Sequence, residues 1–164
     1  MNLYIRVGGA ALVSIGALFI SKEYEKYLKK RGDEYRGLVA LISHAEGQMS
    51  GFLAYGSALW RNFEDEALEN CGILPELREG KGLAEAFDTC VSRMSLPKAV
   101  AKEISKSLRA LGNSYLDTEL QTLGEIKVRL TELLKSEEEQ REKNIKVARA
   151  LLLGAALCAI ILAL

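Results

Sequence analysis

Histidine, proline and tryptophan are scarce in this chain, whose 164 residues include one His, two Pro and one Trp. His44 has no second histidine with which to form an HExxH motif, and the three cysteines form no Cys-x-x-Cys pair. The common zinc-site patterns are therefore excluded. The 22 basic residues equal the 22 acidic ones, which removes the electrostatic case for nucleic acid, because phosphate binding needs an excess of Lys and Arg. The length allows one domain with a sizeable core.

The charges that are present are unevenly distributed. Residues 22–146 hold 20 of the bases and all 22 acids, a net charge of −2, and only Arg6 and Arg149 lie outside that range. No charge occurs in residues 7–21 or in residues 150–164, two mostly apolar runs of 15 residues each. This distribution predicts a soluble domain between two membrane-seeking ends.

We expect residues 1–21 to form an N-terminal transmembrane anchor and residues 147–164 a C-terminal transmembrane helix. A span needs about 20 residues, which the first run reaches when extended to Met1 and the second when extended back to Ile145. A cleaved signal peptide is the alternative at the first end, but residues 20–24 offer no small-x-small cleavage site. At the second end the alternative is a hydrophobic helix buried against a partner.

Basic residues flank the middle of the chain on both sides. By the positive-inside rule, this places the middle in the cytoplasm and both termini outside. Cys71 and Cys90 would then lie in a reducing compartment and Cys158 in lipid, which agrees with three unpaired thiols. The flanking bases are Lys22, Lys26, Lys29, Lys30 and Arg31 after the first run, and Lys135, Arg141, Lys143, Lys146 and Arg149 before the second.

The middle, residues 22–134, is predicted to be an all-α helical bundle, because its apolar residues recur at helical spacing. One stripe runs from Leu38 to Phe52, and the glycines near residues 51–57 predict a helix break. A second stripe runs from Leu59 to Leu68.

Glycine and proline mark the remaining boundaries of the bundle. Gly72 is expected to end the second helix, with Pro75 following it as a stop. Residues 78–82 are predicted to form a turn, residues 83–94 a third helix, and Pro97 to start a fourth that ends at Gly112.

A last helix is predicted from Tyr115 to the end of the chain. Ser114, with Asp117 three residues on, resembles a capping box at its start. Residues 135–146 lack an apolar stripe, so they are predicted to be an exposed, charged helical neck. Three i,i+4 pairs support the neck by about 0.2–0.5 kcal/mol each: Glu137–Arg141, Glu139–Lys143 and Glu142–Lys146.

The residues that usually carry chemistry form no catalytic pattern. His44 stands alone, and Cys71 and Cys90 have no histidine near them in sequence. Gly80-Lys81-Gly82 lacks the GxxxxGK[ST] pattern of a phosphate loop and is predicted to be a turn, and the successive acids of residues 137–139 point in three directions. We therefore expect no enzyme activity, cofactor, metal or small-molecule substrate.

Small residues at four-residue spacing occur in the C-terminal apolar run, at Ala150, Gly154 and Cys158. Such spacing lets a second helix approach closely in lipid. In an Ala-rich segment the pattern also arises by chance. The partner helix would be the first span, where Gly9 and Gly16 share a face, or another subunit, so a homo-oligomer is one option.

The layout of the whole chain resembles a known family, stage III sporulation protein AB of endospore-forming bacteria. Residues 83–87 resemble a family segment, with Phe87 where tryptophan is usual. Leu111-Gly112 followed by Asp117 and Gln121 resembles the LG…DxxxQ signature, with a different interval before Asp117. Ala45-Glu46 stands where the family has Leu-Glu, without the Thr-Pro that commonly follows.

The resemblance implies a function that the residues alone do not name. It implies a non-catalytic platform or assembly component of the channel complex between mother cell and forespore, needed for endospore formation. Its helical domain would resemble that of the type II secretion platform protein and would dock a secretion-type ATPase. The other partners would be stage III sporulation membrane proteins, and the location the cell membrane on the mother-cell side of the forespore envelope.

The resemblance also gives candidate partner-contacting residues: Glu46, Glu85, Phe87, Gly112, Asp117 and Gln121. Asp117 and Gln121 are four residues apart and share a helix face, which would contact another helix or subunit. The alternative is that Asp117 caps its own helix and Gln121 binds a loop backbone group. For the whole chain, the alternatives are a membrane-tethered signalling or adaptor module, and a membrane enzyme.

Overall fold

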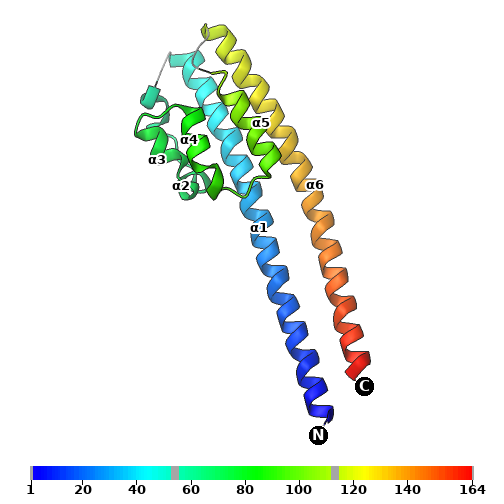
Figure 1. The fold of residues 1–164 in the computed structure, drawn as a ribbon. Coiled ribbons are helices and arrows are strands. Elements are labelled where there is room, and N and C mark those ends of the chain that lie inside the picture. Colours follow the sequence, from blue (N-terminus) through cyan, green and yellow to red (C-terminus); the bar gives the residue numbers. More distant parts are fainter. Residues whose placement is uncertain (1, 53–55, 112–114, 164) are drawn as a thin grey trace. The chain divides into compact units, whose positions relative to one another are not determined.

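The computed structural model describes residues 2–52, 56–111 and 115–163. All regular secondary structure in these ranges is helical, which confirms the all-α prediction (Figure 1). The elements are α1 (Asn2–Phe52), η1 (Gly56–Trp60), α2 (Glu66–Cys71), α3 (Ile73–Arg78), α4 (Leu83–Cys90), η2 (Val91–Arg93), α5 (Lys98–Leu108) and α6 (Leu116–Ala163), where η marks a 3₁₀ helix.

The chain divides into two compact units, and both long helices contribute to each. The first unit, called the helical domain here, is Lys30–Ser136. The second comprises Met1–Lys29 and Glu137–Leu164, and its described parts are called the arms. The sequence-based boundaries at residues 22, 134 and 146 remain predictions.

Among the residues that the structure describes, no helix is long and apolar enough to cross a membrane. The transmembrane helices predicted for residues 1–21 and 147–164 are therefore unsupported.

The core of the helical domain is built on one face of α1. Leu38, Leu41, Ile42, Ala45 and Met49 are all buried, which confirms the predicted stripe. Their i, i+3, i+4 spacing places them on one side of the helix. The same cluster includes further buried residues from the other helices: Leu68, Leu74, Phe87, Ile104, Leu123 and Leu130.

The predicted second helix, with its stripe from Leu59 to Leu68, was wrong. The chain forms the short η1 up to Trp60 and then turns, and α2 begins only at Glu66. Asp65 sets this start, because its extended backbone (φ −155°) and its carboxylate, which accepts from the Leu68 N–H at 2.9 Å, form a helix N-cap. Leu59 and Trp60 are buried as a helical stripe would be, so spacing alone could not separate the two arrangements.

Helix α3 is not among the predicted helices, because the sequence pattern places Pro75 after a helix end. Gly72 ends α2 in the left-handed region (φ +93°), as predicted, but the chain enters a new helix at Ile73. Pro75 lies in the first turn of α3, where a missing N–H costs nothing. The predicted turn that follows is present from Glu79, with Gly80 at φ +96°.

The last helix was predicted well, since α6 begins one residue after Tyr115 and runs for 48 residues. The proposed capping residues Asn113 and Ser114 lie outside the described residues. In the predicted neck, Lys146 Nζ lies 4.0 Å from Glu142, with both side chains exposed. Exposed pairs of this kind contribute little to stability.

Gly37 allows α1 to approach α2 closely. A Cβ at this position would lie 2.7 Å from Asp65 Oδ1 and 2.9 Å from Leu68 Cγ, the two residues that form the α2 cap. Real Cβ atoms do not come this close, so a side chain at position 37 must shift the side chains of Asp65 and Leu68 at the start of α2.

We predict that Gly37→Ala destabilises the protein by about 1–3 kcal/mol, because the added methyl overpacks the contact between α1 and α2. Gly47→Ala is the matched control in the same helix. A Cβ there meets nothing within 4 Å, so this change should stabilise the protein by about 0.5–1 kcal/mol through backbone entropy. Denaturant unfolding of the full chain measures both, and equal effects would contradict the close contact.

Glu34 is the one charged side chain among the described buried residues. Its Oε2 accepts from the Ser95 N–H at 2.7 Å, and its Oε1 lies 3.8 Å from Lys30 Nζ. Burial raises the pKa of this carboxyl, and the bond from Ser95 and the charge of Lys30 offset that rise only in part. The carboxylate therefore links α1 to the segment between η2 and α5 at an electrostatic cost.

A pH dependence follows from the raised pKa of Glu34. The Glu34 carboxyl binds its proton more tightly in the folded state than in the unfolded chain. Glu34 therefore stabilises the fold below the ordinary carboxyl pKa, and this stabilisation is lost as the pH rises through the pKa of the folded state. The Glu34→Gln variant keeps an acceptor for the Ser95 N–H. As the pH rises from 4 to 8, its free energy of unfolding should increase relative to that of the unchanged chain. A constant difference across this range would show that Glu34 does not titrate in this way.

Candidate partner-docking site

An apolar pocket of about 300 Å³ opens in the helical domain where several elements converge. Its walls come from the last turns of α1, from η1, from the turn before α4, from the end of α5 and from the start of α6. Apolar residues dominate the lining, among them Met49, Trp60, Leu83, Leu108, Leu111 and Leu123. The pocket is open to solvent, so a side chain from outside can enter it.

Two charged residues of opposite sign border this pocket. Lys81 pairs with Glu76 of α3, and this contact raises the pKa of Lys81, so the amine stays charged at neutral pH. Glu119, half-buried, lines the other side from the first turns of α6. An apolar site with a few charges can orient a partner as well as bind it.

The residues predicted to contact a partner occupy different environments. Glu46 of α1 forms an ion pair with Lys127 of α6, and both side chains are about one third exposed. Glu85 is exposed in the first turn of α4, next to the pocket residue Ala84. Phe87 is fully buried in the core, so its surface is not accessible to a partner in this conformation. Gly112 lies outside the described residues.

Asp117 and Gln121 lie on the exposed face of α6, as their spacing predicts. Asp117 is in the first helical turn, where a carboxylate interacts favourably with the helix dipole. Gln121 donates to Glu125 Oε1 at 3.1 Å, a contact along its own helix and not to a loop backbone group. Glu119 lies between them in sequence but faces the pocket, because two residues rotate a helix by about 200°.

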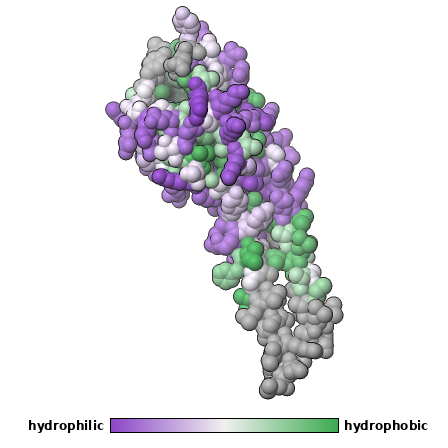
Figure 2. Space-filling model, viewed as in Figure 1, coloured by the Kyte–Doolittle hydropathy of each residue, from purple (hydrophilic) through white to green (hydrophobic). Residues whose placement is uncertain are grey.

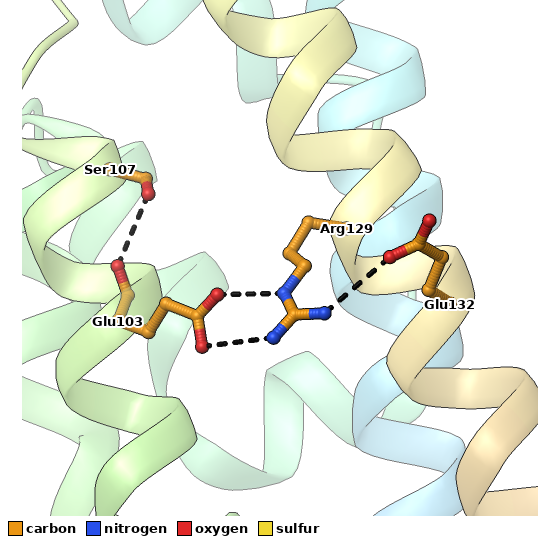
Figure 3. A network of polar contacts seen from close by, with 4 residues as sticks. All are labelled: Glu103, Ser107, Arg129 and Glu132. Carbon is orange, nitrogen blue, oxygen red and sulfur yellow. Dashed lines mark hydrogen bonds and ion pairs between the residues drawn. The ribbon is translucent and has the colours of Figure 1, made fainter.

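Ion pairs connect α5 to its neighbours, and Figure 3 shows the one between α5 and α6. Arg129 of α6 donates from Nε and Nη2 to the two oxygens of Glu103, at 2.7 and 3.4 Å, and also reaches Glu132 at 3.5 Å. This fork lowers the pKa of Glu103 and raises that of Arg129. On the other side, Asp88 of α4 has a lowered pKa because Ser105 and Arg109 donate to it.

The residues that are most often catalytic are engaged within the fold. His44 Nε2 lies 2.8 Å from the carbonyl oxygen of Leu59, and its ring packs 5.1 Å from that of Phe63. Cys71 and Cys90 are buried, and burial raises the pKa of both thiols, which keeps them protonated and poorly nucleophilic. No group of three or more metal-ligating side chains is found in the described part of the chain.

The small residues predicted to pack membrane helices, Ala150, Gly154 and Cys158, are all exposed on α6. A Cβ placed on Gly154 would meet no described atom within 4 Å. Within one chain the described residues therefore bring no second helix against this stripe, and its role in packing remains a prediction.

Sequence reasoning missed Lys81 and Glu119 as site residues. From sequence, Lys81 is predicted only to lie in a turn, which the structure confirms, and Glu119 is given no role of its own. Neither carries a sequence signal for a pocket, because the pocket arises where the turn after α3 meets helices whose lining residues lie up to 42 residues from Lys81 in sequence.

The chain was compared with protein families, with curated proteins and with solved structures. The family model for stage III sporulation protein AB matches residues 6–164, nearly the whole chain. The comparisons with curated proteins and with solved structures gave no match. The family match confirms the resemblance that the sequence motifs indicated. The chain therefore belongs to the stage III sporulation protein AB family, and its role lies in sporulation.

Proposed function

We propose that this protein is a non-catalytic assembly component of the mother cell–forespore channel complex, and that its helical domain docks a secretion-type ATPase. The observation that carries the docking is the open apolar pocket beside exposed charged residues of α4 and α6. Family membership supports the sporulation part of the proposal.

The size and lining of the pocket suit a protein partner. At about 300 Å³ it lies at the small end of the range for drug-sized ligands, so it suits one or two apolar side chains of a docking segment. Protein interfaces commonly depend on such a buried anchor with a polar rim around it. Here Lys81, Glu119 and Glu85 supply charges at or near the rim.

A non-catalytic role agrees with how the reactive side chains are used. His44 is held by a backbone carbonyl, and the two thiols of the domain are buried away from the pocket lining. The pocket contains a lysine and a glutamate, but the lysine is bound to Glu76 in an ion pair. A scaffold that positions other proteins needs stable helices and specific surfaces, and this domain supplies both.

We propose further that the arms hold the protein at the membrane, with the helical domain on the cytoplasmic, mother-cell side. Exposed apolar side chains on the α1 arm support this: Ile15, Leu18, Phe19 and Ile20 are 55–72% exposed. Figure 2 shows hydrophobic side chains gathered on the arms beside the residues drawn in grey. Apolar groups this exposed indicate an apolar partner, which lipid would provide.

The docking proposal predicts that Ala84→Glu weakens ATPase binding about tenfold or more, because it places a charge on the pocket wall. A tenfold loss corresponds to about 1.4 kcal/mol. The matched control is Ala99→Glu on the exposed surface of α5, outside the pocket lining. Co-purification of the co-expressed ATPase in mild detergent measures binding, and circular dichroism checks the fold. If both variants retained the ATPase equally, the pocket would not be the docking site.

A second prediction concerns the exposed face of α6. Gln121→Ala, alone or with Asp117→Asn, should change stability by no more than about 0.5 kcal/mol, because these side chains are exposed. If they contact a partner, the yield of heat-resistant spores should fall at least tenfold. Gln140→Ala, another exposed glutamine of α6, is the control and should sporulate normally. Normal sporulation of the double variant would leave Asp117 and Gln121 with local roles only.

A further inference from the structure

One face of the α1 arm carries apolar residues followed by lysines. At 100° per residue, six exposed residues of this arm fall within an arc of about 100°. They are Ile15, Leu18, Phe19, Lys22, Lys26 and Lys29, in chain order. The apolar half of the face ends at Phe19 and the basic half begins three residues later.

The lysines of this face are available to an external partner. Lys26 pairs with Glu23 at 2.7 Å, but the two side chains are 74% and 65% exposed, so the pair is solvated and weak. Among the described residues, no ion pair or hydrogen bond engages Lys22 or Lys29. Two acids of the arm flank this arc, the exposed Glu23 and the half-buried Glu25, so its three lysines leave a net positive charge.

Two tyrosines lie at the same level of the helix. Tyr24 and Tyr27 are 40% and 46% exposed, more than such large apolar rings usually are in a packed interface. Tyrosine is favoured at membrane–water boundaries because its ring is apolar and its hydroxyl is polar. Along the arm, apolar side chains come first and tyrosines and lysines follow. This order matches that of a bilayer, in which hydrocarbon is followed by headgroups.

The dimensions agree with this order. Phe19 and Lys22 are separated by about 4.5 Å along the helix, and Lys22 and Lys29 by about 10 Å. The headgroup layer on one side of a bilayer is about 5–7 Å thick, and the field of anionic lipids extends a further Debye length of about 8 Å. All three lysines therefore lie within reach of headgroup charge when Phe19 is at the hydrocarbon boundary.

We infer that the Lys22–Lys26–Lys29 face of α1 binds anionic phospholipid headgroups, so that the protein selects anionic over zwitterionic lipid around its N-terminal arm. This inference rests on the proposed membrane association. The occupant is lipid and not an acidic protein, because the same face continues directly into exposed Ile15, Leu18 and Phe19, which an acidic protein surface would leave uncovered.

The test uses the full chain reconstituted into vesicles of phosphatidylcholine with 30% phosphatidylglycerol. Spin-labelled phosphatidylglycerol and phosphatidylcholine report which lipid is held at the protein surface. Each lysine near an anionic surface is worth roughly fivefold in binding, so we expect a clear preference for phosphatidylglycerol that weakens at 0.5 M salt. Replacing Lys22, Lys26 and Lys29 together by Gln should remove most of it.

The matched control replaces three exposed lysines of α5, Lys98, Lys102 and Lys106, by Gln, and should keep the preference. If the protein floats with vesicles but selects neither lipid, or if the arm variant retains the preference, the inference is overturned and the membrane association stands. If the unchanged protein does not float with vesicles at all, both are overturned. A sporulation defect in the arm variant without any lipid preference would assign the lysines to an acidic protein partner, against the inference.

Discussion

The burial of one face of α1 is the constraint on which the rest of the domain depends. Leu38, Leu41, Ile42 and Met49 form a continuous buried stripe, and residues from every other α-helix join them in a single core. Gly37 lies at the edge of this stripe and leaves room for Asp65, the N-cap of α2. The position of α2 therefore follows from the backbone of α1, and α3 follows α2 directly because Gly72 both ends one helix and precedes the next.

The polar contacts between helices fix the relative positions of the helices around that core, and they contribute less to its stability. Glu103–Arg129 and Glu46–Lys127 connect α6 to α5 and α1, and their partly exposed groups gain little free energy from water-screened attraction. Their value is geometric, since a forked Arg–carboxylate pair holds one relative position of two helices. Glu34 differs, because its burial makes the charge costly and its bond to the Ser95 N–H correspondingly specific.

The packing of the helical domain also creates the surface on which the proposed docking depends. Packing of α1, η1, α4, α5 and α6 leaves an apolar pocket with Lys81 and Glu119 at its border, which is the proposed docking surface. Helices α1 and α6 each continue from the helical domain into an arm, so two uninterrupted helices join the domain covalently to the arms. The proposed role between an ATPase and a membrane complex depends on this continuity.

The sequence by itself determined the all-α class, a helix break near residues 51–57, the helix end at Gly72, the turn at Gly80 and the long final helix, because periodicity, glycine and proline act over a few residues. It also identified the family. Only the tertiary structure decided that Leu59 and Trp60 lie on a 3₁₀ helix, that Pro75 lies in the first turn of a helix, that Phe87 is internal, and that Lys81 and Glu119 border the same pocket. The reason is physical. An apolar residue can be buried equally well on a helix or on a turn, so the apolar pattern does not distinguish the two, and a pocket is formed by segments that meet only when the chain has packed.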